Sequence, residues 1–174
     1  LGKDSSGNSN NFTPNNFSVS AGEGNDSLED TPTNNFCTMN PLMMNGTEVA
    51  GTHSEGLLTW KSDDNYATTQ ATFPVTTGKW YWECEMESQY VSIAGITRGT
   101  GAAENTFVGY DTNGNLFGFG YYYNDGTVKG STDGLGTISN NNLATSQTTA
   151  ANGDILGIAS DIANGYLIFY KNGT

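Results

Sequence analysis

The sequence predicts an all-β protein: an antiparallel β-sandwich preceded by an extended, mostly irregular N-terminal arm. Two observations predict the sandwich, namely short runs of β-branched and aromatic residues from Val49 onward and turn dipeptides between those runs. A third is that no segment carries the 3.6-residue periodicity of an amphipathic helix. A chain of 174 residues is long enough for one well-buried domain with an arm.

Residues 1–46 form the predicted arm. Runs of Asn, Ser and Gly interrupted by prolines give this segment neither helical nor sustained strand periodicity. A proline also biases the residue before it toward extended backbone. We expect the arm to be held down at a few apolar anchors, which are Phe12, Phe17, Phe36, Met39 and Leu42.

Residues 47–174 form the predicted sandwich. The candidate strands are residues 56–60, 66–75, 80–87, 92–97, 106–110, 116–123, 155–161 and 166–171. Tight hairpin turns require a positive φ angle, which Asn-Gly and Asp-Gly dipeptides accept readily. Four such dipeptides fall between the strands: Asn113-Gly114, Asp125-Gly126, Asp133-Gly134 and Asn164-Gly165.

Two of these strands predict which residues enter the core. Residues 80–87 alternate apolar and polar side chains, which places Trp80, Trp82, Cys84 and Met86 on one face, and we expect that face to be buried. Residues 155–159 are almost continuously apolar instead. Such a run is typical of a strand covered on both sides or packed beneath the arm.

Three ordered sequence blocks carry a resemblance to a known family. They are residues 77–85 (TGKWYWECE), residues 92–96 (SIAGI) and residues 153–173 (GDILGIASDIANGYLIFYKNG). In this order they resemble the first signature strand, the short strand that follows it and a later hairpin of the SPRY family. The resemblance runs from about residue 56 to the end of the chain. It departs from the family in the middle, where residues 117–121 (FGFGY) stand in place of a Trp-Gly pair.

The resemblance implies a concanavalin-like sandwich that is used for binding. A SPRY sandwich normally has at least one further strand after the Lys171-Asn172-Gly173 turn, so we expect the domain to be incomplete at its C-terminus. We also interpret Leu1 as an internal cut in a longer protein, because the first residues resemble neither an initiator methionine nor a signal peptide.

The arm carries a second resemblance. Residues 2–18, 26–33 and 36–42 are similar to a linker found in tail-fibre-like proteins of bacteriophages. This resemblance implies a virion surface location, with other virion subunits as partners and a homo-oligomer, for which we favour a trimer.

Charge and composition exclude several classes of partner. Six basic and eighteen acidic residues give a formal net charge of −12, which repels a phosphate backbone, so we expect no nucleic-acid partner. No stretch approaches the roughly 20 apolar residues that cross a bilayer, so we expect no membrane insertion. Two cysteines are not a disulfide framework, and one bridge between Cys37 and Cys84 remains an alternative. We favour two separate thiols, because Cys84 lies on an apolar strand face and a free cysteine is commonly a small buried hydrophobe.

Three glutamates raise an enzymatic alternative. Glu83, Glu85 and Glu87 alternate along one strand, with the spacing of the acidic strand in laminarinase-type and lichenase-type glycoside hydrolases. A retaining glycosidase needs two carboxyl groups about 5 Å apart. The segment fits the SPRY strand better, so we favour a solvated acidic face and expect a protein that is not an enzyme and has no catalytic residues.

Metal ligands are sparse. His53 is the only histidine, which leaves no multi-histidine metal site, and we interpret it as a loop residue. Some Asp and Asn spacings would suit calcium, although Asx turns explain them as well and are favoured, so we expect no metal and no cofactor. These residues are Asp4, Asn8, Asp26, Asp30, Asp111, Asn113 and Asn115.

The densest aromatic cluster supplies the candidate binding residues. In the run Tyr121-Tyr122-Tyr123, alternation along a strand places at least one tyrosine outward, where it would suit a sugar or a protein contact. Specificity would come from the loops at residues 61–65, 98–105, 124–134 and 139–153. The candidate ligand-binding residues are Tyr121, Tyr122, Tyr123, Asn124, Asp125 and Arg98.

The sequence supports three functional hypotheses. The favoured one is a virion adhesion module, from a phage tail fibre, that binds a host surface glycan or protein through the loops of the sandwich. The second is a glycan-degrading enzyme acting through Glu83 and Glu87. The third is a structural or capsid-decorating virion protein without a ligand.

Overall fold

The computed structural model describes residues 2–18, 33, 35–45, 51–62, 67–87, 92–98, 108, 117–131, 141–144 and 149–174. Within these ranges the chain has eleven β-strands and no helix, so no helix there is available to span a membrane. Every strand pairing is antiparallel, which confirms the predicted all-β antiparallel architecture.

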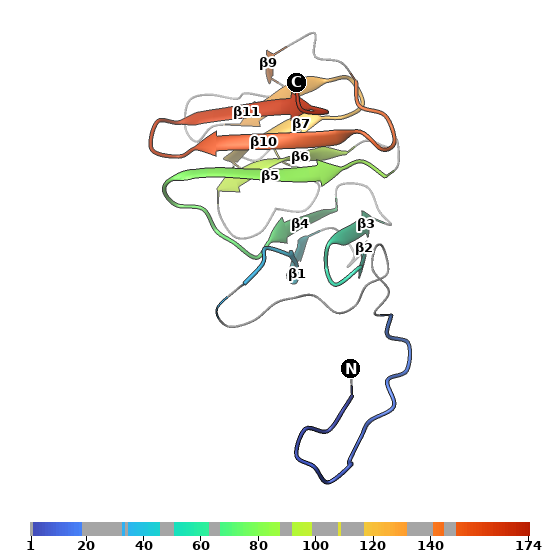
Figure 1. Cartoon of the computed structure of the whole chain (residues 1–174). Coiled ribbons are helices and arrows are strands. Elements are labelled where there is room, and N and C mark those ends of the chain that lie inside the picture. Colours follow the sequence, from blue (N-terminus) through green and yellow to red (C-terminus); the bar gives the residue numbers. More distant parts are fainter. Residues whose placement is uncertain are drawn as a thin grey trace.

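The strands form two larger sheets and two small pairs. One larger sheet has the order β11-β10-β5 and the other has the order β6-β7-β8-β9, while β1 pairs with β4 and β2 with β3. Figure 1 shows the two larger sheets as stacked layers, with β11, β10 and β5 in front and the two small pairs below. The strand bounds are β1 (Met39–Asn45), β2 (Gly51–Ser54), β3 (Thr59–Ser62), β4 (Thr68–Ala71), β5 (Lys79–Glu85), β6 (Ile93–Arg98), β7 (Phe117–Tyr122), β8 (Thr127–Ser131), β9 (Asn141–Ala144), β10 (Ile155–Asp161) and β11 (Tyr166–Lys171).

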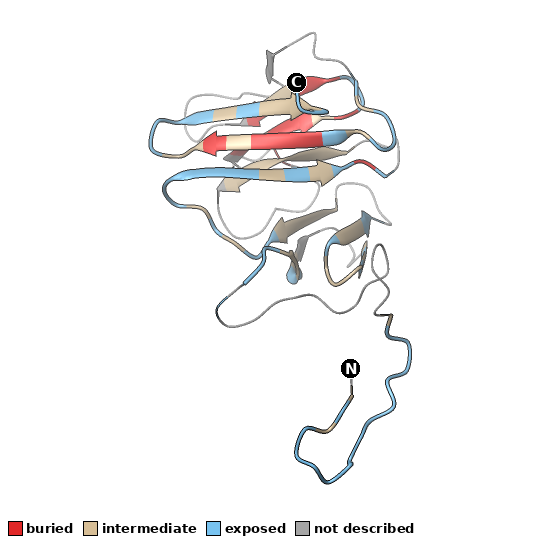
Figure 2. Ribbon diagram, viewed as in Figure 1, coloured by how far each residue is buried: buried red, intermediate tan, exposed pale blue. Residues whose placement is uncertain are grey.

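The core lies between the two layers and centres on β10. Leu156 and Ile158 point inward and are 2% and 0% exposed, and buried residues concentrate on this strand in Figure 2. Tyr121 from β7 meets Phe169 from β11 across the interface, with ring centroids 6.0 Å apart. These contacts join the front and back layers into one sandwich.

The alternation predicted for residues 80–87 is observed, with one correction. Met86 belongs to the core cluster, Trp82 packs against that cluster, and Cys84 is half-buried. Trp80 is exposed instead, because it lies at the start of β5, where its indole Nε1 donates a hydrogen bond to the carbonyl of Thr77 at 2.7 Å. The buried face of β5 therefore begins at Trp82 and not at Trp80.

Two of the predicted hairpins are confirmed. The strands at residues 155–161 and 166–171 have the bounds predicted for them, and Asn164-Gly165 turns between them with a Gly165 φ of 70°. Asp125-Gly126 turns between β7 and β8 in the same way. The dipeptides at 113–114 and 133–134, and all of the predicted strand 106–110 except the buried turn residue Val108, lie outside the described residues.

The arm is irregular over residues 2–18, as predicted, but it differs from the prediction at its end and in its anchors. It ends in a strand, because β1 pairs with β4 and the amide of Met39 donates to the carbonyl of Leu57 at 2.9 Å. The predicted anchors Phe12 and Leu42 are 80% and 90% exposed, and Phe17 and Phe36 are exposed as well. Residues 2–18 extend away from the layers and cover neither of them (Figure 1). Strand β10 is thus not packed beneath the described part of the arm.

Candidate functional site

The tip of the β7–β8 hairpin carries the predicted binding residues Asn124 and Asp125. Asp125 Oδ1 accepts hydrogen bonds from the backbone amide of Thr127 at 2.9 Å and from its hydroxyl at 2.6 Å. The amide of Gly126 donates to the carbonyl of Tyr122 at 2.9 Å. Asp125 therefore fixes the shape of the turn, whereas the Asn124 side chain is exposed at its tip.

Two of the three predicted binding tyrosines are core residues. Tyr121 and Tyr123 are 3% and 4% exposed and pack edge to face, with ring centroids 5.6 Å apart. Burial raises the pKa of both phenols above the ordinary value. Their inward direction follows from the position of the opposite layer, and it removes both rings from the surface that a ligand would contact.

Tyr122 points away from the core and meets a residue that the sequence did not single out. The ammonium group of Lys129 lies 4.0 Å from the centroid of the Tyr122 ring, within the range of a cation–π contact. Lys129 lies on β8 and pairs in register with Gly120 of β7, so it is a diagonal neighbour of Tyr122. Predicting this contact requires strand β8, which was not among the predicted strands.

Arg98 does not join the hairpin group. It is the last residue of β6 and pairs with Phe117, whereas Ile93 at the other end of β6 pairs with Tyr122. Five residue steps along a strand span about 17 Å, so Arg98 lies at the far end of this sheet from the hairpin tip. The Arg98 side chain is outside the described part of the structure, as is most of the predicted loop 98–105.

The other predicted specificity loops are only partly described. Of residues 61–65, the structure describes 61–62; of residues 124–134, it describes 124–131; and of residues 139–153, it describes 141–144 and 149–153. In these loops, residues 124–126 form the tip of the β7–β8 hairpin, and residues 149–153 lie beside the start of β10.

The glutamates that alternate along β5 are exposed, as expected from the interpretation of this segment as a solvated acidic face. Glu83 and Glu85 lie on the outer face of the sheet, and Glu83 Oε1 accepts a hydrogen bond from the Tyr81 hydroxyl at 2.7 Å. Glu87 comes after the end of β5 and accepts from the Thr59 hydroxyl at 3.5 Å. The three carboxylates therefore do not lie on one continuous strand face.

Asp4, one of the candidate metal ligands, has another role in the structure. Both carboxylate oxygens of Asp4 accept hydrogen bonds, Oδ1 from the Ser6 amide at 2.7 Å and Oδ2 from the Ser6 hydroxyl and the Asn10 amide. These bonds form an Asx turn and lower the pKa of Asp4. Among the described residues, no three His, Cys, Asp or Glu side chains group around a metal-sized space. Asp26, Asp30, Asp111, Asn113 and Asn115 lie outside the described residues.

His53 and the two cysteines are also placed. His53 lies in β2 and not in a loop as expected, because β2 pairs with β3, and its Nε2 is 3.0 Å from the Thr69 hydroxyl. Cys37 is exposed and Cys84 half-buried, and both are free thiols, which confirms the prediction that they are separate. Burial raises the pKa of the Cys84 thiol.

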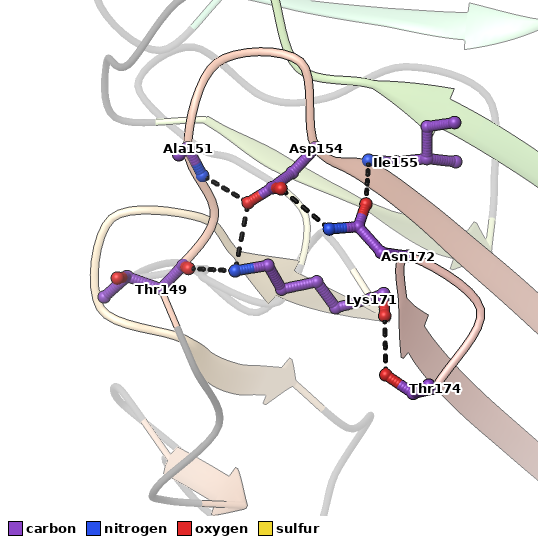
Figure 3. Close-up of polar contacts among 7 residues, drawn as sticks. All are labelled: Thr149, Ala151, Asp154, Ile155, Lys171, Asn172 and Thr174. Carbon is purple, nitrogen blue, oxygen red and sulfur yellow. Dashed lines mark hydrogen bonds and ion pairs between the residues drawn. The ribbon is translucent and has the colours of Figure 1, made fainter.

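A polar cluster around Asp154 joins the two open ends of the β10–β11 hairpin. Asp154 accepts from the Ala151 amide at 2.7 Å and the Asn172 side chain at 2.8 Å, and it lies 3.0 Å from the Lys171 ammonium (Figure 3). The Lys171 ammonium donates to the Thr149 carbonyl at 2.7 Å, and Asn172 Oδ1 accepts from the Ile155 amide at 2.9 Å. This network ties the entry to β10 to the exit from β11, which is a structural role.

The Asp154 network predicts acid sensitivity. Its donors lower the pKa of Asp154 to about 2, led by the Ala151 amide. A carboxyl with a depressed pKa in the folded state stabilises the fold above the ordinary Asp value of about 3.9, and that contribution is lost as pH falls toward 2. We expect the melting temperature to fall between pH 4 and pH 2, and to fall less in Asp154→Asn.

Thermal melts followed by circular dichroism at several pH values measure this effect. Thr174→Ala is the matched control, since the Thr174 hydroxyl bonds the Lys171 carbonyl and not Asp154. It should keep the pH profile of the parent chain. An Asp154→Asn profile that superimposes on the parent profile between pH 4 and pH 2 would contradict the role assigned to this carboxylate.

Comparison with known proteins adds no relative. Neither the family models nor the curated proteins searched contain a match to this chain.

Proposed function

We propose that this chain is a non-enzymatic adhesion module of a virion fibre, from a phage tail fibre, that binds a host surface glycan or protein through the hairpin end of its sandwich. The observation that carries the binding role is the hairpin itself. Tyr121 and Tyr123 anchor it in the core, while Tyr122 is half-buried on the opposite face and Asn124 is exposed. A rigid scaffold that presents polar and aromatic side chains at a loop is a common arrangement in binding proteins.

The virion role has a separate support. It depends on the resemblance of the arm, residues 2–18, 26–33 and 36–42, to linkers of phage tail-fibre-like proteins. The high exposure of the aromatic residues in the described part of the arm is compatible with an extended segment that packs on a neighbouring subunit. Under this proposal the partners are other virion subunits, in a homotrimer, and the location is the virion surface.

The test of the binding role uses a fluorescently labelled chain and a panel of intact bacterial strains. We expect saturable binding to a subset of the strains and at least a fivefold loss of affinity in the double variant Tyr122→Ala with Asn124→Ala. Thr76→Ala is the matched control, because Thr76 is an exposed residue before β5, outside the hairpin and outside all of the predicted specificity loops. Equal binding by the double variant and the parent chain, or binding to none of the strains, would refute the proposed site.

The same cells can be used to distinguish binding of the surface polysaccharide from its enzymatic degradation. If surface polysaccharide were degraded, reducing ends would appear during incubation and would stop appearing in Glu83→Gln, as the enzymatic alternative requires. We expect the amount of reducing ends to stay at the level of the cells alone.

A further inference from the structure

The outer face of the front sheet, formed by β11, β10 and β5, exposes a group of large side chains. Tyr81, Tyr166 and Ile168 are 57%, 65% and 49% exposed, and Ile155 is exposed on the same face. The register places Tyr81 opposite Ala159, and Ala159 opposite Ile168. Tyr81 and Ile168 therefore flank Ala159 across three strands, and Tyr166 is the next residue of β11 on the same face. Three large exposed side chains that lie close together on one face, unlike scattered single ones, mark an interaction surface.

The Tyr81 ring is held flat against this face. A Cβ atom built on Gly157 would lie 2.5 Å from the Tyr81 hydroxyl and 3.2 Å from two of its ring carbons. Gly157 is a diagonal neighbour of Tyr81 in the register, so the ring lies across the sheet and over the glycine backbone. Its hydroxyl donates to Glu83 Oε1 at 2.7 Å, which fixes the far end of the ring.

This arrangement leaves one side of an ordered aromatic ring facing solvent. Tyr170 pairs with Gly157 from the other side and extends the surface along β11. The Glu83 carboxylate at the edge of the ring can accept further hydrogen bonds, since an ionised carboxylate has about four lone-pair sites. An ordered tyrosine with an apolar face and an adjacent acceptor is suited to a ligand that has an apolar face and hydroxyl groups.

We propose that the outer face of the β11-β10-β5 sheet is a binding platform for neutral saccharide chains, with Tyr81 and Tyr166 as stacking residues and Glu83 as a hydrogen-bond acceptor. The C–H face of a sugar ring packs on the tyrosines, and its hydroxyls donate to the carboxylate. The formal charge of −12 and the exposed Glu83 and Glu85 on this face disfavour a polyanionic ligand. The same charges oppose two copies of this chain meeting face to face.

The platform goes beyond the proposed function because it lies on the front layer, whereas Tyr122 points outward from the back layer. Each surface can fail without the other. Loss of cell binding in the hairpin variants with no saccharide binding by the platform would leave only the proposed function. Saccharide binding that depends on Tyr81, without capture by any cell, would leave only the platform.

The experiment is a calorimetric titration of the whole chain with soluble glucan, mannan and galactan and with chitin oligosaccharides. We expect binding to at least one of these probes, weakened at least tenfold by Tyr81→Ala and by Tyr166→Ala. Leu58→Ala is the matched control and should bind as the parent chain does, because Leu58 is 52% exposed in the turn between β2 and β3, outside both proposed surfaces. Tyr166 is the safer variant for folding because it is 65% exposed, and circular dichroism checks each variant.

Two results would overturn the platform. One is that no neutral probe binds the folded parent chain, or that binding survives both tyrosine variants. The other is that the chain sediments as an oligomer that Tyr81→Ala or Ile168→Ala converts to a monomer, because that face would then be an interface between copies of the chain.

Discussion

Replacing Ile158 with alanine should destabilise the chain by about 2–5 kcal/mol, the usual range for truncating a fully buried isoleucine. Ile158 is 0% exposed at the centre of β10, and its neighbours in the core cluster come from both layers. The substitution removes three buried carbon atoms and leaves a cavity that strands paired on both sides of β10 cannot close.

Chemical denaturation followed by tryptophan fluorescence measures this change in the free energy of unfolding. Ile168→Ala is the matched control, because Ile168 lies on the next strand but is exposed on the outer face. It should cost less than about 1 kcal/mol. Similar losses for the two variants would mean that β10 does not form the centre of the core.

Replacing Gly95 with alanine should cost about 3 kcal/mol, the upper end of the usual range for over-packing, because the added methyl group meets backbone atoms of the paired strand. A Cβ atom at this position would contact the Phe119 carbonyl and lie 2.6 Å from Gly120 Cα. An alanine gains only about 0.5–1 kcal/mol in backbone entropy over glycine, so the collision decides the sign. Strands β6 and β7 would have to separate at the Gly95–Gly120 pair.

The same denaturation assay tests this prediction. Ala94→Gly, at the adjacent position of β6, removes a methyl group and adds no collision, and it should cost about 1 kcal/mol. A Gly95→Ala chain as stable as the parent would show that β6 and β7 do not approach as closely as the register requires.

Strong local patterns predicted much of the fold. Strands β10 and β11 were predicted with their observed bounds because the turn dipeptide Asn164-Gly165 separates their two apolar runs. Strand β8 was not predicted. Its sequence, TVKGS, has a single large apolar residue, and it becomes a strand because β7 and β9 pair with it on both sides. Such pairing is non-local, so local propensity does not reveal it.

Four of the five arm anchors were wrong for a related reason, whereas Met39 is half-buried. Phe12 and Leu42 were expected to be buried because they are apolar residues in polar surroundings. An apolar residue is buried only where another element offers a complementary surface, and isolated apolar side chains are common on protein surfaces. The described part of the arm has no such surface at these two positions.

For the candidate site, the sequence predicted only which of the three tyrosines share a face of the strand. Alternation required Tyr122 to face opposite to Tyr121 and Tyr123, and this is observed. Which of the two faces enters the core depends on the side from which the β11-β10-β5 sheet packs, which no short pattern specifies. The Tyr122–Lys129 contact and the position of Tyr81 over Gly157 depend on strand register, so they also emerged only from the structure.

The most direct test of the binding role is a nuclear magnetic resonance titration of the isotope-labelled chain. The ligand is polysaccharide extracted from a bacterial strain whose cells capture the chain. We predict shift changes confined to the hairpin tip around Tyr122 and Asn124 and to the outer face around Tyr81, with the polysaccharide unchanged in length. Shift changes at neither surface, or progressive shortening of the polysaccharide, would contradict a non-enzymatic adhesion module.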